Sequence, residues 1–530
     1  MKKAVFSLSL ILIVCGFAQA QPDALFRHLP PDANTVIRVN VPVMASKIDL
    51  PGLLGHLPVK SDIGQVLKDP ASAGIDLHQD VYITMSGTEP DSATYTCIIF
   101  HLADSARWAS FIRTTYPDAQ YFHQSGPAPS IGWQQQKPDD STGATIRGIG
   151  SAWNNRLGVF TFVRVLPGLN PFRPNAGDAT HWYIRKAVGQ SQAVLQGYPG
   201  SSYTTNQPFI AGFSDDADLT MWNTGSNNFM AMSKMMAHLP GNYGKSAFAP
   251  QRHLNSIIHL RFENGRLLIT STAFLPADTA GVMQKMVSRP FNENLAARLP
   301  QGSLLGMAAM HFDPSVVISF VKKLQPHLDS ILNNKAPDVA RLISAFKGDF
   351  LLAAIAPKGD TGAHAKPNFY FITTINDKST FLDVAHKIHL INDSAAGAMP
   401  DTGRSMLGKL KTAYTIHDSI CVFSRNRDLT DGYFTTTPHT PGLLSDDFRN
   451  NYFTLVVDIK AVLAFVQSAS AGDSQQSGKV QQMQAILSQF DRFTLTLGFR
   501  HKNEMTSSFE IRLADPSVNS LKLFSGFFMH

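Results

Sequence analysis

The order of predicted strands and helices occurs twice along the chain, and this repetition constrains the fold more than any other feature of the sequence. The first half opens with an alternating apolar segment at 36–41, followed by Pro42 and an apolar-periodic helix. The second half opens with a similar segment at 304–310, followed by Pro314 and a helix over 315–324. A recurring order of elements is typical of a repeated structural unit. We therefore expect two related units.

Later elements keep the same order in both halves. In each half a strand leads through an aspartate, Asp104 or Asp377, into a helix that carries an aromatic residue. Hairpins then turn at Asn or Asp, which tolerate the positive φ angles of tight turns. The matched segments are 80–84 and 349–352, 95–102 and 369–375, and the turns Asn154-Asn155 and His417-Asp418.

Each half closes with a long alternating hairpin. The first hairpin turns at Asn264-Gly265, and the second pairs 493–499 with 509–513. Strict alternation indicates strands that bury one face. Strands interrupted by two or three helices predict an α+β fold of two related tandem units, each a mostly antiparallel sheet with helices packed on one face.

The boundary between the two units is expected near residues 291–302, where Pro290, Pro300 and Gly302 punctuate the chain. The first α+β unit then spans 21–295 and contains a loop-rich insertion at about 164–213. The second unit spans 296–530.

Residues 1–20 have the three parts of a cleavable signal peptide. Lys2 and Lys3 precede an apolar segment at 4–17, and Ala18-Gln19-Ala20 offers a cleavage site before Gln21. The apolar segment is shorter than the roughly 20 residues that span a bilayer, and no later segment is longer. The sequence predicts export to the periplasm or the cell exterior, without a transmembrane helix.

The cysteines leave one alternative for the location of the protein. Cys15 could carry a lipid anchor, which would make the chain an outer-membrane lipoprotein. Val14 disfavours this because a lipidated cysteine normally follows a small residue. Cys97 and Cys421 lie in apolar, strand-like segments, where lone cysteines are usually core residues. A disulfide between them is the alternative in an oxidising compartment.

The charge of the chain gives little indication of a partner. The formal net charge is +6, charged residues make up 16%, and the basic residues are scattered. Nucleic-acid binding requires a concentrated basic patch, so no nucleic-acid partner is expected.

Several segments together resemble a known family. They are HLPPDANTVIRVNVPVMASKIDLPGLL, which begins at His28, then DPASAGIDLHQDVYI and, later, DDADLTMWNT. The chain resembles the exported Bacteroidota proteins of the domain of unknown function 4836 family, over most of its length. The resemblance implies a cell-envelope protein, and it transfers no catalytic residue.

Motifs that carry chemistry are weak in this sequence. The phosphate-loop-like segment at 239–246 lacks its first glycine, and Ser319 with Lys322 lacks the partner motifs of penicillin-recognising enzymes. His386 and His389 lie one helical turn apart near Asp383 and form the best metal-like cluster, although a zinc site needs further ligands. Neither a catalytic residue nor a cofactor is therefore predicted.

Aromatic residues in the first half give the remaining candidate site. Rings beside amide side chains can hold sugars or peptides. The alternative is that these rings fix long loops onto the sheet. The candidate ligand-binding residues are Trp133, Trp153, Trp182, Tyr183, Tyr198 and Tyr203.

These features predict an exported binding or scaffold module without catalytic activity. Its partner would be an envelope glycan, a peptide or another envelope protein. The alternative is an envelope hydrolase that acts on glycan or peptide through a site assembled from residues distant in sequence.

Overall fold

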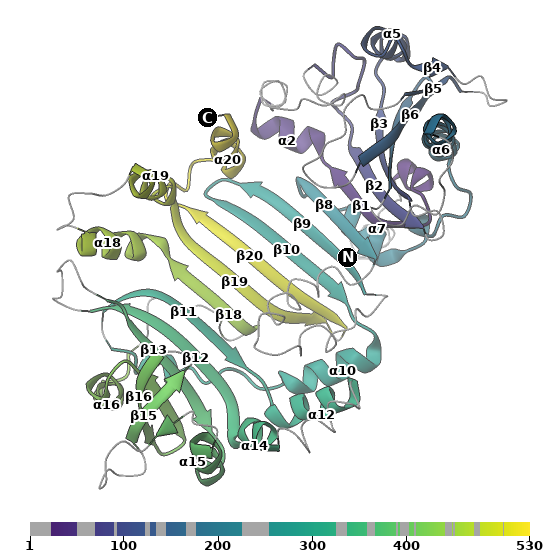
Figure 1. The fold of residues 1–530 in the computed structure, drawn as a ribbon. Helices are drawn as coiled ribbons and strands as arrows, with labels where there is room; N and C mark the ends of the chain where they lie inside the picture. Colours follow the sequence, from purple (N-terminus) through teal and green to yellow (C-terminus); the bar gives the residue numbers. More distant parts are fainter. Residues whose placement is uncertain are drawn as a thin grey trace, which may run out of the picture. The chain divides into compact units, whose positions relative to one another are not determined.

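Figure 1 shows the fold in a computed structural model of the chain. The structure describes residues 23–49, 69–88, 93–121, 128–133, 145–165, 176–224, 254–300, 302–324, 337–357, 366–387, 391–392, 402–407, 410–439, 448, 451–470, 478–501 and 503–529. The signal-peptide segment and Cys15 lie outside these residues. So do His389 and the phosphate-loop-like segment.

The chain forms two compact units that are discontinuous in sequence. Unit 1 comprises residues 1–232, 250–262 and 521–530, and unit 2 comprises residues 233–249 and 263–520. The last helix of the chain therefore belongs to unit 1. These units are defined by contacts in space and not by sequence repetition. The boundary of the sequence repeat near 291–302 therefore stays a prediction.

The sheet of unit 1 is antiparallel throughout the described residues. Its strand order is β4-β5-β6-β7-β3-β2-β1-β8-β9. The strands are β1 Ala33–Val39, β2 Val81–Thr88, β3 Ala93–His101, β4 Gln120–Tyr121, β5 Ser130–Trp133, β6 Thr145–Trp153, β7 Leu157–Val165, β8 Leu219–Thr224 and β9 Asn255–Glu263.

Helices cover this sheet through aromatic and aliphatic contacts. The Asp104 side chain caps α5 by accepting hydrogen bonds from two backbone amides, and Trp108 of the same helix is fully buried against the sheet. Helix α6 packs on β5, β6 and β7. The helical segments are η1 Ala24–His28, α2 Val41–Lys47, α5 Ser105–Thr115, α6 Ala176–Gln196, η2 Ser202–Thr204, α7 Gln207–Phe213 and α20 Ser520–Met529.

The sheet of unit 2 follows a similar path and is also antiparallel. Its strand order is β14-β15-β16-β17-β13-β12-β11-β18-β19-β20-β10. The strands are β10 Arg266–Phe274, β11 Ser303–His311, β12 Phe346–Ala356, β13 Asn368–Ile375, β14 Ile391–Asn392, β15 Thr402–Leu407, β16 Leu410–His417, β17 Ile420–Ser424, β18 Asn451–Asp458, β19 Phe490–His501 and β20 Glu504–Leu513.

A core of unit 2 lies on the face of β11, β12 and β13 that carries Met307, Leu351 and Tyr370. Phe291 and Leu295 come from the segment before β11 and pack into this core. The helices are α10 Ala277–Met286, α11 Asn294–Ala297, α12 Pro314–Leu324, α14 Pro337–Ala345, α15 Lys378–Lys387, α16 Arg427–Thr435, α18 Ile459–Ser470 and α19 Gly478–Leu487.

The predicted mixture of helices with an antiparallel sheet is confirmed. The turns lie where the sequence predicts them: Asp418 has φ +52° and Gly265 has φ +75°, and Asn154 accepts two backbone hydrogen bonds. Cys97 and Cys421 are both buried and free. Among the described residues, none of the helices combines the length and the hydropathy that a membrane span requires.

Candidate functional site

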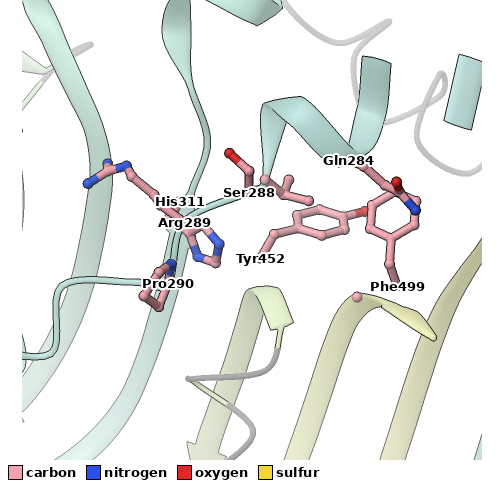
Figure 2. Close-up of a pocket in the computed structure, with 9 residues that line it drawn as sticks. Gln284, Ser288, Arg289, Pro290, His311, Tyr452 and Phe499 are labelled. Atoms are coloured by element: carbon pink, nitrogen blue, oxygen red, sulfur yellow. The ribbon is translucent and has the colours of Figure 1, made fainter. Parts of the chain in front are cut away.

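A pocket of about 380 Å³ lies in unit 2 where the ends of three strands meet a loop. Its walls come from the end of α10, the loop 287–290, the last residue of β11, the start of β18 and the end of β19 (Figure 2). The lining residues are Gln284, Val287, Ser288, Arg289, Pro290, His311, Tyr452, Gly498 and Phe499.

Local backbone features position the pocket walls. The pairing of β18 with β19 shifts register between Asn451 and Phe453, so Tyr452 lies in a bulge. Bulges redirect side chains and are common beside functional sites. The loop is held from its other end, where Phe291 is buried in the core. The backbone amide of Asn292 also donates to Asp349 Oδ1 at 3.2 Å.

Beside the pocket, Arg289 forms an ion pair with a buried carboxylate. Arg289 Nη2 lies 2.9 Å from Asp349 Oδ2, and the Asp349 side chain is 1% exposed. The same nitrogen donates to the carbonyl of Lys347 at 2.7 Å. The Thr374 hydroxyl donates to Asp349 Oδ2 at 2.9 Å. The guanidinium charge is thus balanced within the protein.

His311 lies between this ion pair and the open part of the pocket. It is opposite Asp349 in the pairing of β11 with β12 and is 3% exposed. Burial lowers its pKa, while the Asp349 charge and the Val287 carbonyl oppose that shift. His311 Nδ1 forms no hydrogen bond with any described residue. The imidazole is therefore neutral near pH 7, and one of its ring nitrogens has no partner.

Two aromatic rings form the opposite wall. The centroids of Tyr452 and Phe499 are 6.0 Å apart, and their planes are inclined by 38°. The Tyr452 hydroxyl donates to Met505 Sδ at 3.6 Å, and sulfur is a weak acceptor. Burial raises the pKa of Tyr452 to about 12, so this phenol is neutral at physiological pH. Figure 2 shows Gln284 reaching towards Phe499 and Tyr452.

Among the described residues, the polar side chains at the pocket are not arranged as a nucleophile, base and acid. Ser288, His311 and Asp349 have the residue types of a nucleophile, a base and an orienting acid. Asp349, however, directs its oxygens to Arg289, Thr374 and a backbone amide. Figure 2 shows the Ser288 hydroxyl directed away from the His311 ring.

A second surface feature of unit 2 is an apolar sheet face on β11, β12 and β13. Met310, Leu352 and Phe369 are 36%, 48% and 55% exposed. The strand registers place all three side chains on the same face. Contiguous exposed apolar surface is typical of contact sites for other molecules.

The aromatic residues that the sequence suggested as a ligand site separate into several environments. Trp133 and Trp153 are buried in the core beneath α5, where Trp133 stacks on Tyr116 at 4.2 Å. Tyr183 is buried in another cluster. Tyr203 is 3% exposed, and its hydroxyl donates to the Ala33 carbonyl at 2.6 Å. These four rings pack the interior of unit 1.

The other two aromatic candidates are more accessible. Trp182 is 36% exposed, and the Lys186 ammonium lies 5.1 Å from its ring centroid. Tyr198 is half-buried, and its hydroxyl accepts from Gln190 Nε2 at 3.3 Å. Their role in ligand binding stays a prediction.

The metal-like cluster on α15 can be described only in part. His386 Nδ1 lies 2.8 Å from the Leu382 carbonyl of its own helix, and Asp383 pairs with Arg341 at 3.0 Å. His389 lies outside the described residues. Within the described ranges, no group of three or more His, Cys, Asp or Glu side chains could hold a metal ion.

Acidic residues before β8 form ion pairs in unit 1. Asp215 pairs with Arg261 at 2.5 Å. The fully buried Asp218 pairs with Lys47 at 2.6 Å and accepts from the Phe262 amide at 2.7 Å. Asp215 also accepts from the Ala217 amide, as a turn residue does. These contacts give the aspartates a structural role.

Sequence reasoning missed the pocket in unit 2. Its residues extend from Gln284 to Phe499, and each lies in an ordinary strand end, helix end or loop. A weak signal was available in Asp349, a carboxylate at the start of a strongly apolar strand. Buried carboxylates require partners, so an aspartate at this position indicates a cationic side chain nearby.

Comparisons with known proteins give little further evidence. No protein-family model matches the chain, and no curated protein matches it. A solved structure described as "Structure of crystal form IV of TP0453" is similar with a TM-score of 0.26 and 10% sequence identity, over 49% of this chain and 83% of that one. At that TM-score, the likeness identifies neither fold nor function.

Proposed function

We propose that this chain is an exported cell-envelope protein that binds a ligand without chemically changing it. The signal-peptide pattern of residues 1–20 supports export, and cleavage before Gln21 would release the protein from the membrane. The pocket of unit 2 supports ligand binding, because aromatic and hydrogen-bonding groups converge on one concave site.

The contacts of Asp349 support the proposal that the protein does not catalyse a reaction. A nucleophile–base–acid set needs the acid to orient the base through a hydrogen bond. Asp349 instead bonds Arg289 at 2.9 Å and Thr374 at 2.9 Å. These contacts fix the loop that carries Ser288, which is a structural task.

The hydrolase alternative is favoured by one observation. Ser288 and His311 come from separate segments and line one pocket, and Asp349 lies opposite His311 on the neighbouring strand. A ligand could reorient Ser288, since catalytic hydrogen bonds are often long before substrate binds. Envelope glycan or peptide would be the substrate of such a hydrolase.

We also propose that the chain arose by internal duplication. The strand order of unit 1, from β4 through β9, is the same as that of unit 2 from β14 through β19. Each strand of unit 1 corresponds to the strand of unit 2 whose number is higher by ten. The exposed face of β11–β13 is a second surface that could contact another envelope protein.

Two measurements test the proposed function. The intact mass of the protein isolated from the envelope should correspond to a chain that begins at Gln21. An acylated chain that begins at Cys15 would instead show a lipoprotein. The purified protein is then incubated with envelope glycan and peptide fractions, and soluble products are sought by mass spectrometry. Products that disappear in His311→Gln would establish the hydrolase and overturn the binding proposal.

A further inference from the structure

We propose that the pocket in unit 2 binds an uncharged saccharide of one or two rings. This inference rests on the proposed binding function and gives the chemical class of its ligand. The pocket volume of about 380 Å³ lies near the lower end of the range of small-molecule sites. A sugar ring presents an apolar face of C–H groups and a rim of hydroxyls, so its site needs both an aromatic wall and polar groups.

The charge balance of the pocket favours a neutral ligand. Arg289 is the charged residue among the described lining residues, and its guanidinium is bonded to Asp349 at 2.9 Å and to the Lys347 carbonyl at 2.7 Å. An anionic ligand would have to compete with a carboxylate that is already in place. Tyr452 and His311 are both neutral near pH 7 for the reasons given above.

The aromatic wall offers an apolar surface of the size of a sugar ring. Tyr452 and Phe499 lie on adjacent strands, with centroids 6.0 Å apart. Figure 2 shows both rings at one side of the pocket, with Ser288 and His311 across from them. A ring that rests on this wall would turn its hydroxyls towards those polar side chains.

Unused hydrogen-bonding capacity points to a hydroxylated ligand. His311 is 3% exposed, and no described residue bonds its Nδ1 atom. The Tyr452 hydroxyl has a sulfur partner at 3.6 Å. Buried polar atoms without strong partners raise the free energy of the empty site. A sugar hydroxyl both donates and accepts, so it can complement an imidazole nitrogen and a phenol alike.

An extended peptide fits this site less well. Peptides that bind along a sheet add a strand to a free edge. Gly498 of β19 already pairs with Asn451 on one side and with Thr506 on the other. The β19 backbone at the pocket is therefore paired on both sides, so strand addition to β19 is blocked.

The test is isothermal titration calorimetry of the full mature chain with three probes. Two probes are neutral disaccharides, cellobiose and N,N′-diacetylchitobiose, and the third is N-acetyl-trialanine amide. The variants are Tyr452→Phe, which keeps the ring and removes the hydroxyl, and Phe499→Leu, which removes the ring. Ile486→Ala is the matched control, because it removes an exposed apolar side chain of unit 2 that lies outside the pocket lining. Trp182→Ala tests the other candidate ligand site, which lies in unit 1.

We expect at least one disaccharide to bind at one site per chain, and each pocket variant to weaken binding about tenfold or more. Ile486→Ala should leave the affinity unchanged. The saccharide proposal is overturned if neither disaccharide binds up to about 10 mM, or if Trp182→Ala abolishes binding while the pocket variants do not. Peptide binding that is lost in Phe499→Leu would refute the ligand class and leave the binding function standing. Cleavage of a probe would refute the binding function itself.

Discussion

Replacing Asp349 by asparagine is expected to destabilise unit 2 by about 2–3 kcal/mol. The substitution keeps the size and shape of the side chain and removes its charge. Arg289 then loses its partner at 2.9 Å, and the Thr374 hydroxyl loses an anionic acceptor at 2.9 Å. The new amide can still accept from the Asn292 backbone amide, so one hydrogen bond remains available.

The magnitude follows from the unequal burial of the two partners. Breaking a fully buried pair costs about 3–5 kcal/mol, whereas an exposed pair contributes about 1 kcal/mol or less. The Asp349 side chain is 1% exposed and that of Arg289 is 35% exposed. Water can therefore solvate part of the unpaired guanidinium, which places the expected loss between these limits.

The assay must report on unit 2 separately. All five tryptophans of the chain lie at or before residue 222 and therefore within unit 1. Tryptophan fluorescence during urea unfolding then follows unit 1, while far-UV circular dichroism follows both units. We expect Asp349→Asn to shift the dichroism transition to lower urea and to leave the fluorescence midpoint in place.

Asp418→Asn provides the matched control. It makes the same chemical change in unit 2, at a side chain that is 86% exposed and pairs only with His417 at 3.1 Å among the described residues. Asparagine tolerates the φ of +52° at this position, so the turn should persist. If the two substitutions lower the free energy of unfolding equally, burial does not explain the stabilisation by the Arg289–Asp349 pair.

Four further outcomes are expected. Gly348→Ala should lower the melting temperature, because this residue has φ +100° and a Cβ atom there would overlap a backbone oxygen. An unchanged melting curve would show that the added methyl group causes no strain. Burial raises the pKa of Cys97 to about 11 and that of Cys421 well above its usual value, so neither thiol should react with Ellman's reagent at pH 8 until urea is added. Burial lowers the pKa of His311, so the neutral imidazole stabilises the folded state fully above about pH 6.5. This stabilisation is lost as the pH falls through the lowered pKa of the folded state. His311→Gln should therefore flatten the pH dependence of the stability of unit 2 as the pH falls below about 6.5. Asp218→Ala removes the fully buried partner of the ion pair with Lys47. The free energy of unfolding of unit 1, followed by tryptophan fluorescence, should therefore fall by about 3 kcal/mol.

Local chemistry explains why the strands, helices and turns could be predicted. Asp104 caps α5 through its own side chain, and Asp418 takes the positive φ that its residue type tolerates. These effects depend on a few adjacent residues. The large antiparallel sheet follows from the alternating segments, which pair with their neighbours in sequence order at most positions.

The pocket could not be predicted because it depends on register and on long-range packing. Tyr452 reaches the site through a one-residue shift between β18 and β19, and no local pattern encodes that shift. The aromatic candidates lie in several environments for a related reason. Trp133 lies on a strand that is buried along its whole length, because structure covers both of its faces. A short sequence of four residues gives no indication of such double coverage.

The assignment of residues 521–530 to unit 1 affects the order in which the chain can fold during synthesis. Unit 1 contains the N-terminal strands, but its final helix leaves the ribosome only after residues 263–520 have been made. At a rate of roughly 5–20 residues per second, the delay is about 10–50 s. During this interval the N-terminal unit lacks one of its own helices and remains incomplete. Such a delay would suit the export that we propose, because residues 521–530 join unit 1 only after unit 2 has been synthesised.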